Sequence, residues 1–253
     1  LFHAGKFAES FEQFRESRDI DPNMNHPNVS LGRLFTQKDD IERARKAFER
    51  AYKEDGDTEA TAHAYAEWLI QQDKLEQAGD VAATLRDAYP DSVRALLLEG
   101  IIARLQGDAS GVQQAMSAIL DLDVSNSSAI DLLALTLIES ENDKDREKAL
   151  GYAQMNAERY QNQTKPNVTL AWVLHRLGRK READVALQKA VKAGNVNADS
   201  AYLIANILAE RDQKERAAEM LQQLMDQAGS GVFLFRKDAE QLLQELQASR
   251  PTN

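Results

Sequence analysis

The stretch Leu31–Ala51, LGRLFTQKDDIERARKAFERA, places small and large side chains at fixed distances from each other. Gly32 is followed three residues later by Phe35, and Ala44 is followed four residues later by Phe48. Residues three or four positions apart on an α-helix lie on the same face. Small residues on that face let a second helix approach closely, and large residues beside them fill the remaining space. The stretch therefore predicts two helices that pack tightly against each other.

The same pattern recurs along the chain at a spacing of 34 residues, with one shift of three residues after the fourth position. Every position reached from Gly32 carries a small residue: Gly32, Ala66, Gly100, Ala134, Ala171 and Ala205. The series that starts from Ala44 is also almost entirely small: Ala44, Ala78, Val112, Ala149, Ala183 and Ala217. Self-similarity at a fixed period indicates a repeat architecture, in which each unit buries its apolar face against its neighbours.

The pattern resembles the tetratricopeptide repeat, whose signature is Trp-x2-Leu-Gly-x2-Tyr, then Ala-x3-Phe, then Pro. Leu31-Gly32-x2-Phe35 and Ala44-x3-Phe48 correspond to this signature, and Gly56 stands where the proline would be. The resemblance covers nearly the whole chain. It implies an all-α solenoid, a superhelix of antiparallel helix pairs with a helix A and a helix B in each repeat. A composition with only 5 Pro and 12 Gly in 253 residues agrees with a helical protein.

The phase of the repeat divides the chain. Residues 1–24 are interpreted as the C-terminal part of a truncated first repeat, so we expect further protein upstream of Leu1. Six full repeats follow, at 25–58, 59–92, 93–126, 127–163, 164–197 and 198–231. The repeat at 127–163 carries three extra residues, which we expect in a charged loop around Asn142–Arg146. Residues 232–248 are expected to form a C-terminal capping helix, and 249–253 a short tail.

Composition weighs against several classes of function. The absence of cysteine excludes disulfides, thiolate metal sites and a cysteine nucleophile, and it leaves both cytoplasm and periplasm open as compartments. A formal net charge of -10 disfavours nucleic-acid binding, because phosphate backbones attract basic surfaces. No run approaches the roughly 18 apolar residues of a membrane span. The four histidines fall in separate segments and no phosphate-binding loop is present, so we expect no metal, no cofactor and no catalytic residue.

The resemblance places candidate binding residues on helix A, because in this family the helices A line a concave groove that usually holds an extended peptide or a partner helix. The ten candidates in the central repeats are Arg94, Leu98, Ile101, Arg104, Leu105, Leu135, Ile138, Trp172, His175 and Arg176. Two interpretations of the apolar members stay open: they contact a partner, or they pack on neighbouring helices. The arginines either bind acidic side chains or a terminal carboxylate, or they are ordinary solvated charges.

The main functional hypothesis is a non-catalytic protein–protein interaction scaffold that binds a peptide or partner segment in this groove. One alternative is a regulatory or targeting arm of a larger protein or enzyme, whose other domain lies upstream. Another is a module that associates with itself through its N-terminal edge. The residues identify neither the partner nor the pathway.

Overall fold

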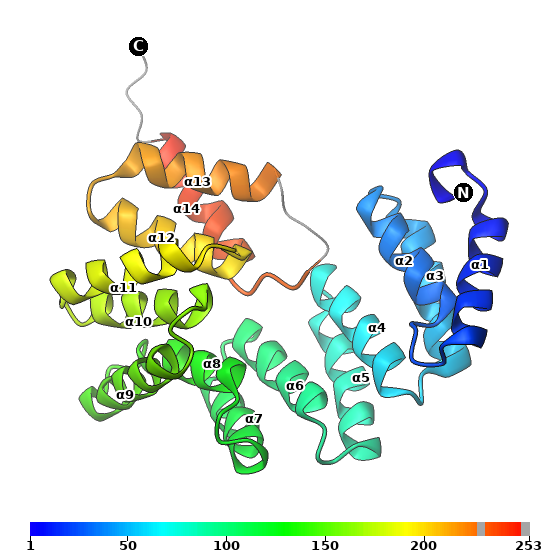
Figure 1. Ribbon diagram of the computed structural model, residues 1–253, viewed down its shortest axis with the longest axis horizontal. Coiled ribbons are helices and arrows are strands. Elements are labelled where there is room, and N and C mark those ends of the chain that lie inside the picture. Colours follow the sequence, from blue (N-terminus) through cyan, green and yellow to red (C-terminus); the bar gives the residue numbers. More distant parts are fainter. Residues whose placement is uncertain (227–230, 249–253) are drawn as a thin grey trace. The chain divides into compact units, whose positions relative to one another are not determined.

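The structure is a computed structural model, and it describes residues 1–226 and 231–248 of the chain (Figure 1). All the regular elements in those residues are helical, which confirms the predicted all-α class. A 3-10 turn at Phe2–Ala4 comes first. The α-helices are α1 (Phe7–Ile20), α2 (Pro27–Gln37), α3 (Ile41–Asp55), α4 (Glu59–Gln71), α5 (Leu75–Ala88), α6 (Val93–Leu105), α7 (Ala109–Leu122), α8 (Ser127–Leu137), α9 (Asp143–Arg159), α10 (Thr164–Arg176), α11 (Lys180–Ala193), α12 (Ala198–Glu210), α13 (Lys214–Asp226) and α14 (Arg236–Ala248).

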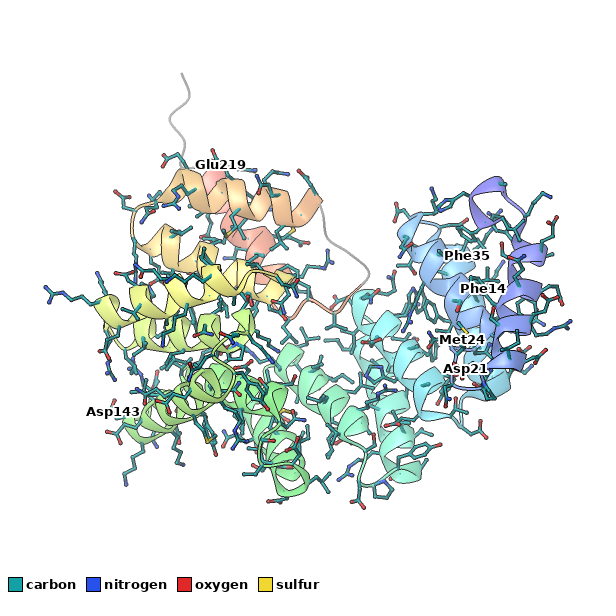
Figure 2. All side chains as sticks on the ribbon, viewed as in Figure 1. Phe14, Asp21, Met24, Phe35, Asp143 and Glu219 are labelled. Atoms are coloured by element: carbon teal, nitrogen blue, oxygen red, sulfur yellow. The ribbon has the colours of Figure 1, made fainter. Side chains whose placement is uncertain are left out.

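The described helices fall two by two into the predicted ranges 25–58 to 198–231, while α14 lies in the range 232–248. The expected tail at 249–253 lies outside the described residues. The three extra residues at 127–163 do not form a loop, because Asp143–Arg146 belong to the first turn of α9. Asn142 caps this helix by accepting a hydrogen bond from the backbone N–H of Lys144, and Asp143 lies exposed at its outer end (Figure 2). The extra residues therefore lengthen α9 to 17 residues.

The chain divides into two compact units. Unit 1 comprises Leu1–Gln106 with Gly231 and Val232, and unit 2 takes the described residues from Gly107 to Asp226 and from Phe233 onward. The boundary falls between α6 and α7, inside the predicted repeat 93–126. Each unit has its own hydrophobic core.

Within each unit the helices form two layers. In unit 1, α2, α4 and α6 contact one another in series, and in unit 2 the same holds for α8, α10 and α12. Their partners α3 and α5, or α9 and α11, do not pack on each other to this extent. Since one layer is tighter than the other, each unit curves with helices α2, α4, α6 or α8, α10, α12 on its inner side. These helices A are called the inner layer below.

Gly32 and Phe48, a small and a large residue of the stretch Leu31–Ala51, meet in the core of unit 1. Phe48 of α3 is 2% exposed, and its ring stacks on that of Trp68 at 5.3 Å between centroids. A Cβ atom added to Gly32 of α2 would lie 2.6 Å from Cε2 of Phe48. Phe35, about one turn further along α2, packs against α1, with its ring 5.0 Å from that of Phe7 (Figure 2). Glycine at position 32 thus lets the two helices approach.

Most turns from helix A to helix B share a backbone feature that the repeat pattern did not predict. The second residue after helix A has a positive φ in five of the turns within the described residues. These residues are Asp39, Asp73, Gly107, Gly178 and Asp212. Aspartate and glycine tolerate this left-handed conformation better than most residues. Their recurrence at the repeat spacing was a usable signal for the end of each helix A.

Candidate functional site

The ten candidate residues divide evenly between the two units. Arg94, Leu98, Ile101, Arg104 and Leu105 lie on α6 of unit 1. The other five, Leu135, Ile138, Trp172, His175 and Arg176, lie on or directly after α8 and α10 of unit 2. They are therefore described as two separate surfaces.

The inner layer of unit 1 carries a charged cluster drawn from three helices. Nη2 of Arg33 on α2 lies 3.9 Å from Oε2 of Glu67 on α4, and Nδ1 of His63 lies 3.5 Å from the same oxygen. Burial raises the pKa of Glu67, but the hydrogen bond and charge of His63 and the charges of Arg33 and Arg94 outweigh it, so the pKa lies below its ordinary value. One ionised carboxylate thus lies among two arginines and a histidine.

The candidates on α6 differ in their exposure. Leu98 is 1% exposed and belongs to the core of unit 1. Ile101 and Leu105 are half-buried against the same core, while Arg94 is exposed. Arg94, Leu98, Ile101 and Leu105 follow one another at helical spacing, so they share one face of α6. That face changes from charged at the start of the helix to partly apolar at its end.

The candidates in unit 2 are mostly core residues. Leu135 is 3% exposed, and Ile138, Trp172 and His175 are buried as well. The structure thus agrees with the second interpretation for these side chains, which is packing on neighbouring helices. Arg176 is exposed, and its guanidinium carbon lies 5.5 Å from the centre of the Trp172 ring.

Helix α8 explains why these positions are buried. Every residue from Ala129 to Ile138 is buried, although helices of a repeat usually keep one face in solvent. The sequence of this segment, AIDLLALTLI, holds a single charged residue. A helix that is apolar all round is a buried helix, so this composition was a signal that groove positions of α8 are covered.

His175 is held in place by a partner on the next inner helix. Its Nε2 atom lies 2.8 Å from Oε2 of Glu210 at the end of α12, while the imidazole itself is buried. Because Glu210 is half exposed, this contact joins a core residue to the surface of unit 2.

A buried polar pair, Asn156 and Asp131, completes the interior of unit 2. Nδ2 of Asn156 on α9 donates to Oδ1 of Asp131 on α8 at 2.8 Å, and to the carbonyl oxygen of Ser127 at 3.1 Å. Burial raises the pKa of Asp131, against the opposing charge of Lys165. Burial likewise raises the pKa of Asp199 on α12, again opposed by Lys165. Asn156 lies among alanines on the buried face of α9, and this spacing was the sequence signal that could have predicted its burial.

Two kinds of site find no support in the part of the chain that the structure describes. Residues 1–226 and 231–248 contain no group of three or more His, Cys, Asp or Glu residues placed to hold a metal ion. None of the helices in these ranges combines the length and apolar character needed to cross a membrane.

Comparisons with known proteins identify the architecture. Residues 27–58 match the family model described as tetratricopeptide repeat. A tetratricopeptide repeat protein from Parabacteroides merdae has a TM-score of 0.71 and 14% identity, over 97% of this chain and 94% of that one. PilF from Pseudomonas aeruginosa has a TM-score of 0.56 and 18% identity, over 94% of this chain and 100% of that one.

A third structure is the APC/C hetero-tetramer Cut9–Hcn1, with a TM-score of 0.62 and 14% identity. The similarity covers 96% of this chain and 46% of that one, so this chain spans about half of the larger protein. No curated protein sequence matches the chain. At these identities the likeness establishes the fold.

Proposed function

Because the chain is a tetratricopeptide repeat protein, we propose that it is a non-catalytic scaffold that binds a segment of a partner protein on its inner layer. The observation that carries the proposal is the charged cluster of unit 1, formed by Arg33, His63, Glu67 and Arg94. The two arginines outnumber the single carboxylate, so the cluster can accept a further carboxylate from a partner. Arginine suits this role because its planar fork binds carboxylates through two parallel hydrogen bonds.

The neighbouring surface defines the rest of the partner. Ile101 and Leu105 are half-buried on the same face of α6 as Arg94. They lie about one and two turns beyond Leu98. A segment with an acidic residue at the arginines would place its next side chains over these apolar residues. The proposed partner therefore carries an acidic side chain or a terminal carboxylate, with apolar residues next to it in the chain.

Affinity capture from the source lysate tests this proposal. The bait is the full chain, compared with the charge-reversed variant Arg33→Glu/Arg94→Glu. A matched control, Lys53→Glu/Arg181→Glu, makes the same charge change on exposed positions of α3 and α11. A protein captured by the parent and the control but lost by the reversed variant supports the proposal. A protein captured equally by all three places the contact elsewhere.

A second candidate function, self-association through the N-terminal edge, is favoured by one groove. About 760 Å³ of open space lies beside α1, α2 and α3, with apolar side chains from Phe7, Phe11 and Leu31 in its lining. Glu12 and Glu16 also line it, so two copies that meet there would bring like charges together. Sedimentation velocity across a concentration series, for the parent and for Phe11→Ser, tests this alternative. A dimer formed by the parent alone supports it, and a monomer throughout removes it.

A further inference from the structure

The connection before α14 is longer than those between other repeats. Residues 89–92 join α5 to α6 and residues 194–197 join α11 to α12, whereas nine residues separate α13 from α14. Of the part of this link that the structure describes, the last residues read Val232-Phe233-Leu234-Phe235. Phe233 is 8% exposed and Phe235 is 4% exposed. Two buried aromatic side chains in a non-helical link indicate that the link itself is docked.

The docking surface is the inner face of α12. Oδ1 of Asp199 accepts a hydrogen bond from the backbone N–H of Leu234 at 2.8 Å. The ring of Phe235 stacks on that of Tyr202, with 4.9 Å between centroids and 20° between planes. Asp199 and Tyr202 are three residues apart, so they lie on one face of the helix. They are the second and fifth residues of the predicted repeat 198–231, two positions that line the partner groove in proteins of this family.

This combination has the two parts of a peptide-binding surface, one that bonds to the backbone and one that contacts a side chain. A side-chain acceptor holds the backbone whatever its sequence, and an aromatic surface selects the side chain. Tyr202 is itself fixed, because its hydroxyl accepts a hydrogen bond from Nδ2 of Asn206 at 3.0 Å. The guanidinium carbon of Arg236 lies 5.8 Å from the centre of the Phe233 ring, at the start of α14.

Asp199 requires such a donor. It is half-buried in unit 2, where burial raises its pKa, and the charge of Lys165 and the backbone N–H groups of Leu234 and Phe235 oppose that rise. A carboxylate that is partly removed from water loses stability when its hydrogen-bond donors are taken away. An occupant of this face must therefore supply backbone N–H groups as well as an aromatic ring.

We propose that Phe233–Phe235 is an internal ligand, and that the face formed by Asp199 and Tyr202 accepts partner segments with an aromatic–x–aromatic motif that compete with it. This proposal rests on the proposed function and adds a second contact surface, in unit 2, with its own partner chemistry. The partner needs no charge at this site, since Asp199 takes backbone N–H groups. Its binding is coupled to release of the chain's own segment.

The test uses the full chain and the labelled peptide acetyl-GVFLFR-amide, which repeats residues 231–236. In the parent the peptide competes with a tethered segment at an effective concentration on the order of 1 mM. The variant Phe235→Ala removes the tethered ring, so we expect it to bind the peptide at least about tenfold more tightly than the parent by fluorescence anisotropy. Adding Tyr202→Ala to this variant should abolish the gain, and acetyl-GVSLSR-amide should not bind.

Helicity and thermal unfolding of each variant are measured first, because Phe235 is part of the core of unit 2. If Phe235→Ala unfolds the chain, Phe235→Leu keeps the apolar volume and removes only the stacked ring, and the same comparison applies. A folded variant that binds the peptide no better than the parent overturns the proposal. So does a gain that survives Tyr202→Ala. Either result leaves the proposed function standing, because the charge-reversal test addresses residues of unit 1 alone.

Discussion

Substituting Gly32 by alanine tests whether close approach of α2 and α3 shapes the repeat. The new Cβ would lie 2.6 Å from Cε2 and 2.7 Å from Cδ2 of Phe48. The ring has little room to retreat, because it is buried and stacked on Trp68. Overpacking of this kind costs about 1–3 kcal/mol. Replacing a helical glycine by alanine returns about 1 kcal/mol, so we expect a net loss of up to about 2 kcal/mol.

Gly151 and Gly79 provide matched controls in the same chain. Both lie inside helices, α9 and α5, and a Cβ at either position would meet no atom within 4 Å. Alanine at these two positions should therefore stabilise the protein by about 0.5–1 kcal/mol. Urea unfolding followed by circular dichroism compares the three variants. If Gly32→Ala is as stable as Gly151→Ala, the close packing of α2 on α3 does not restrict this position.

A double variant tells whether the clash involves Phe48. Phe48→Leu removes the ring atoms nearest to position 32, at the cost of a smaller core side chain. The cost of Gly32→Ala should then be smaller in the Phe48→Leu background than in the parent. Equal costs in both backgrounds would show that the two positions are independent.

Three further predictions concern unit 2. Leu135→Ala should cost about 2–5 kcal/mol in urea unfolding, because it leaves a cavity in the core. Val191→Ala, at an exposed position, should change stability by no more than about 0.5 kcal/mol. Equal effects would contradict the assignment of Leu135 to the core. Burial raises the pKa of Asp131, so its ionisation opposes folding. Asp131→Asn should therefore gain stability relative to the parent as pH rises above the ordinary Asp range, by about 1.4 kcal/mol for each unit between the folded and unfolded pKa. A difference in urea unfolding that does not change with pH would refute this. Asn142→Ala should cost about 1 kcal/mol by loss of the cap on α9, with Asn142→Asp retaining most of the stability, and a thermal melt unchanged by alanine would contradict the capping role.

The helix pairs were predictable because their determinants are local and repeated. A single contact such as Gly32 with Phe48 is encoded by two residues on adjoining helices, and the same spacing recurs in each pair. Period, size and helix propensity therefore suffice to place the helices. The extra residues at Asn142–Arg146 were placed in a loop because they are charged, but charged residues also suit the exposed first turn of a helix.

Exposure of the candidate site was harder to predict, because it depends on what covers a helix. The repeat phase placed Leu135, Ile138 and Trp172 at groove positions, and it carried no information about burial of that face. The docked segment shows the same difficulty. Phe233 and Phe235 belong to a link whose length departs from the repeat, so the period could not align them with Tyr202.

Site-specific photo-crosslinking tests the central claim, that the inner layer of unit 1 binds the partner, most directly. A photoreactive p-benzoylphenylalanine replaces Gln37, which is exposed at the C-terminal end of α2 in the inner layer. In a second protein it replaces Lys53, which is exposed on α3 of the other layer. Each protein is irradiated in the source lysate, and crosslinked proteins are identified by mass spectrometry. The account predicts a defined partner crosslinked from position 37, lost with Arg33→Glu/Arg94→Glu, and absent from position 53. The same partner crosslinked from position 53 and not from 37 would contradict it.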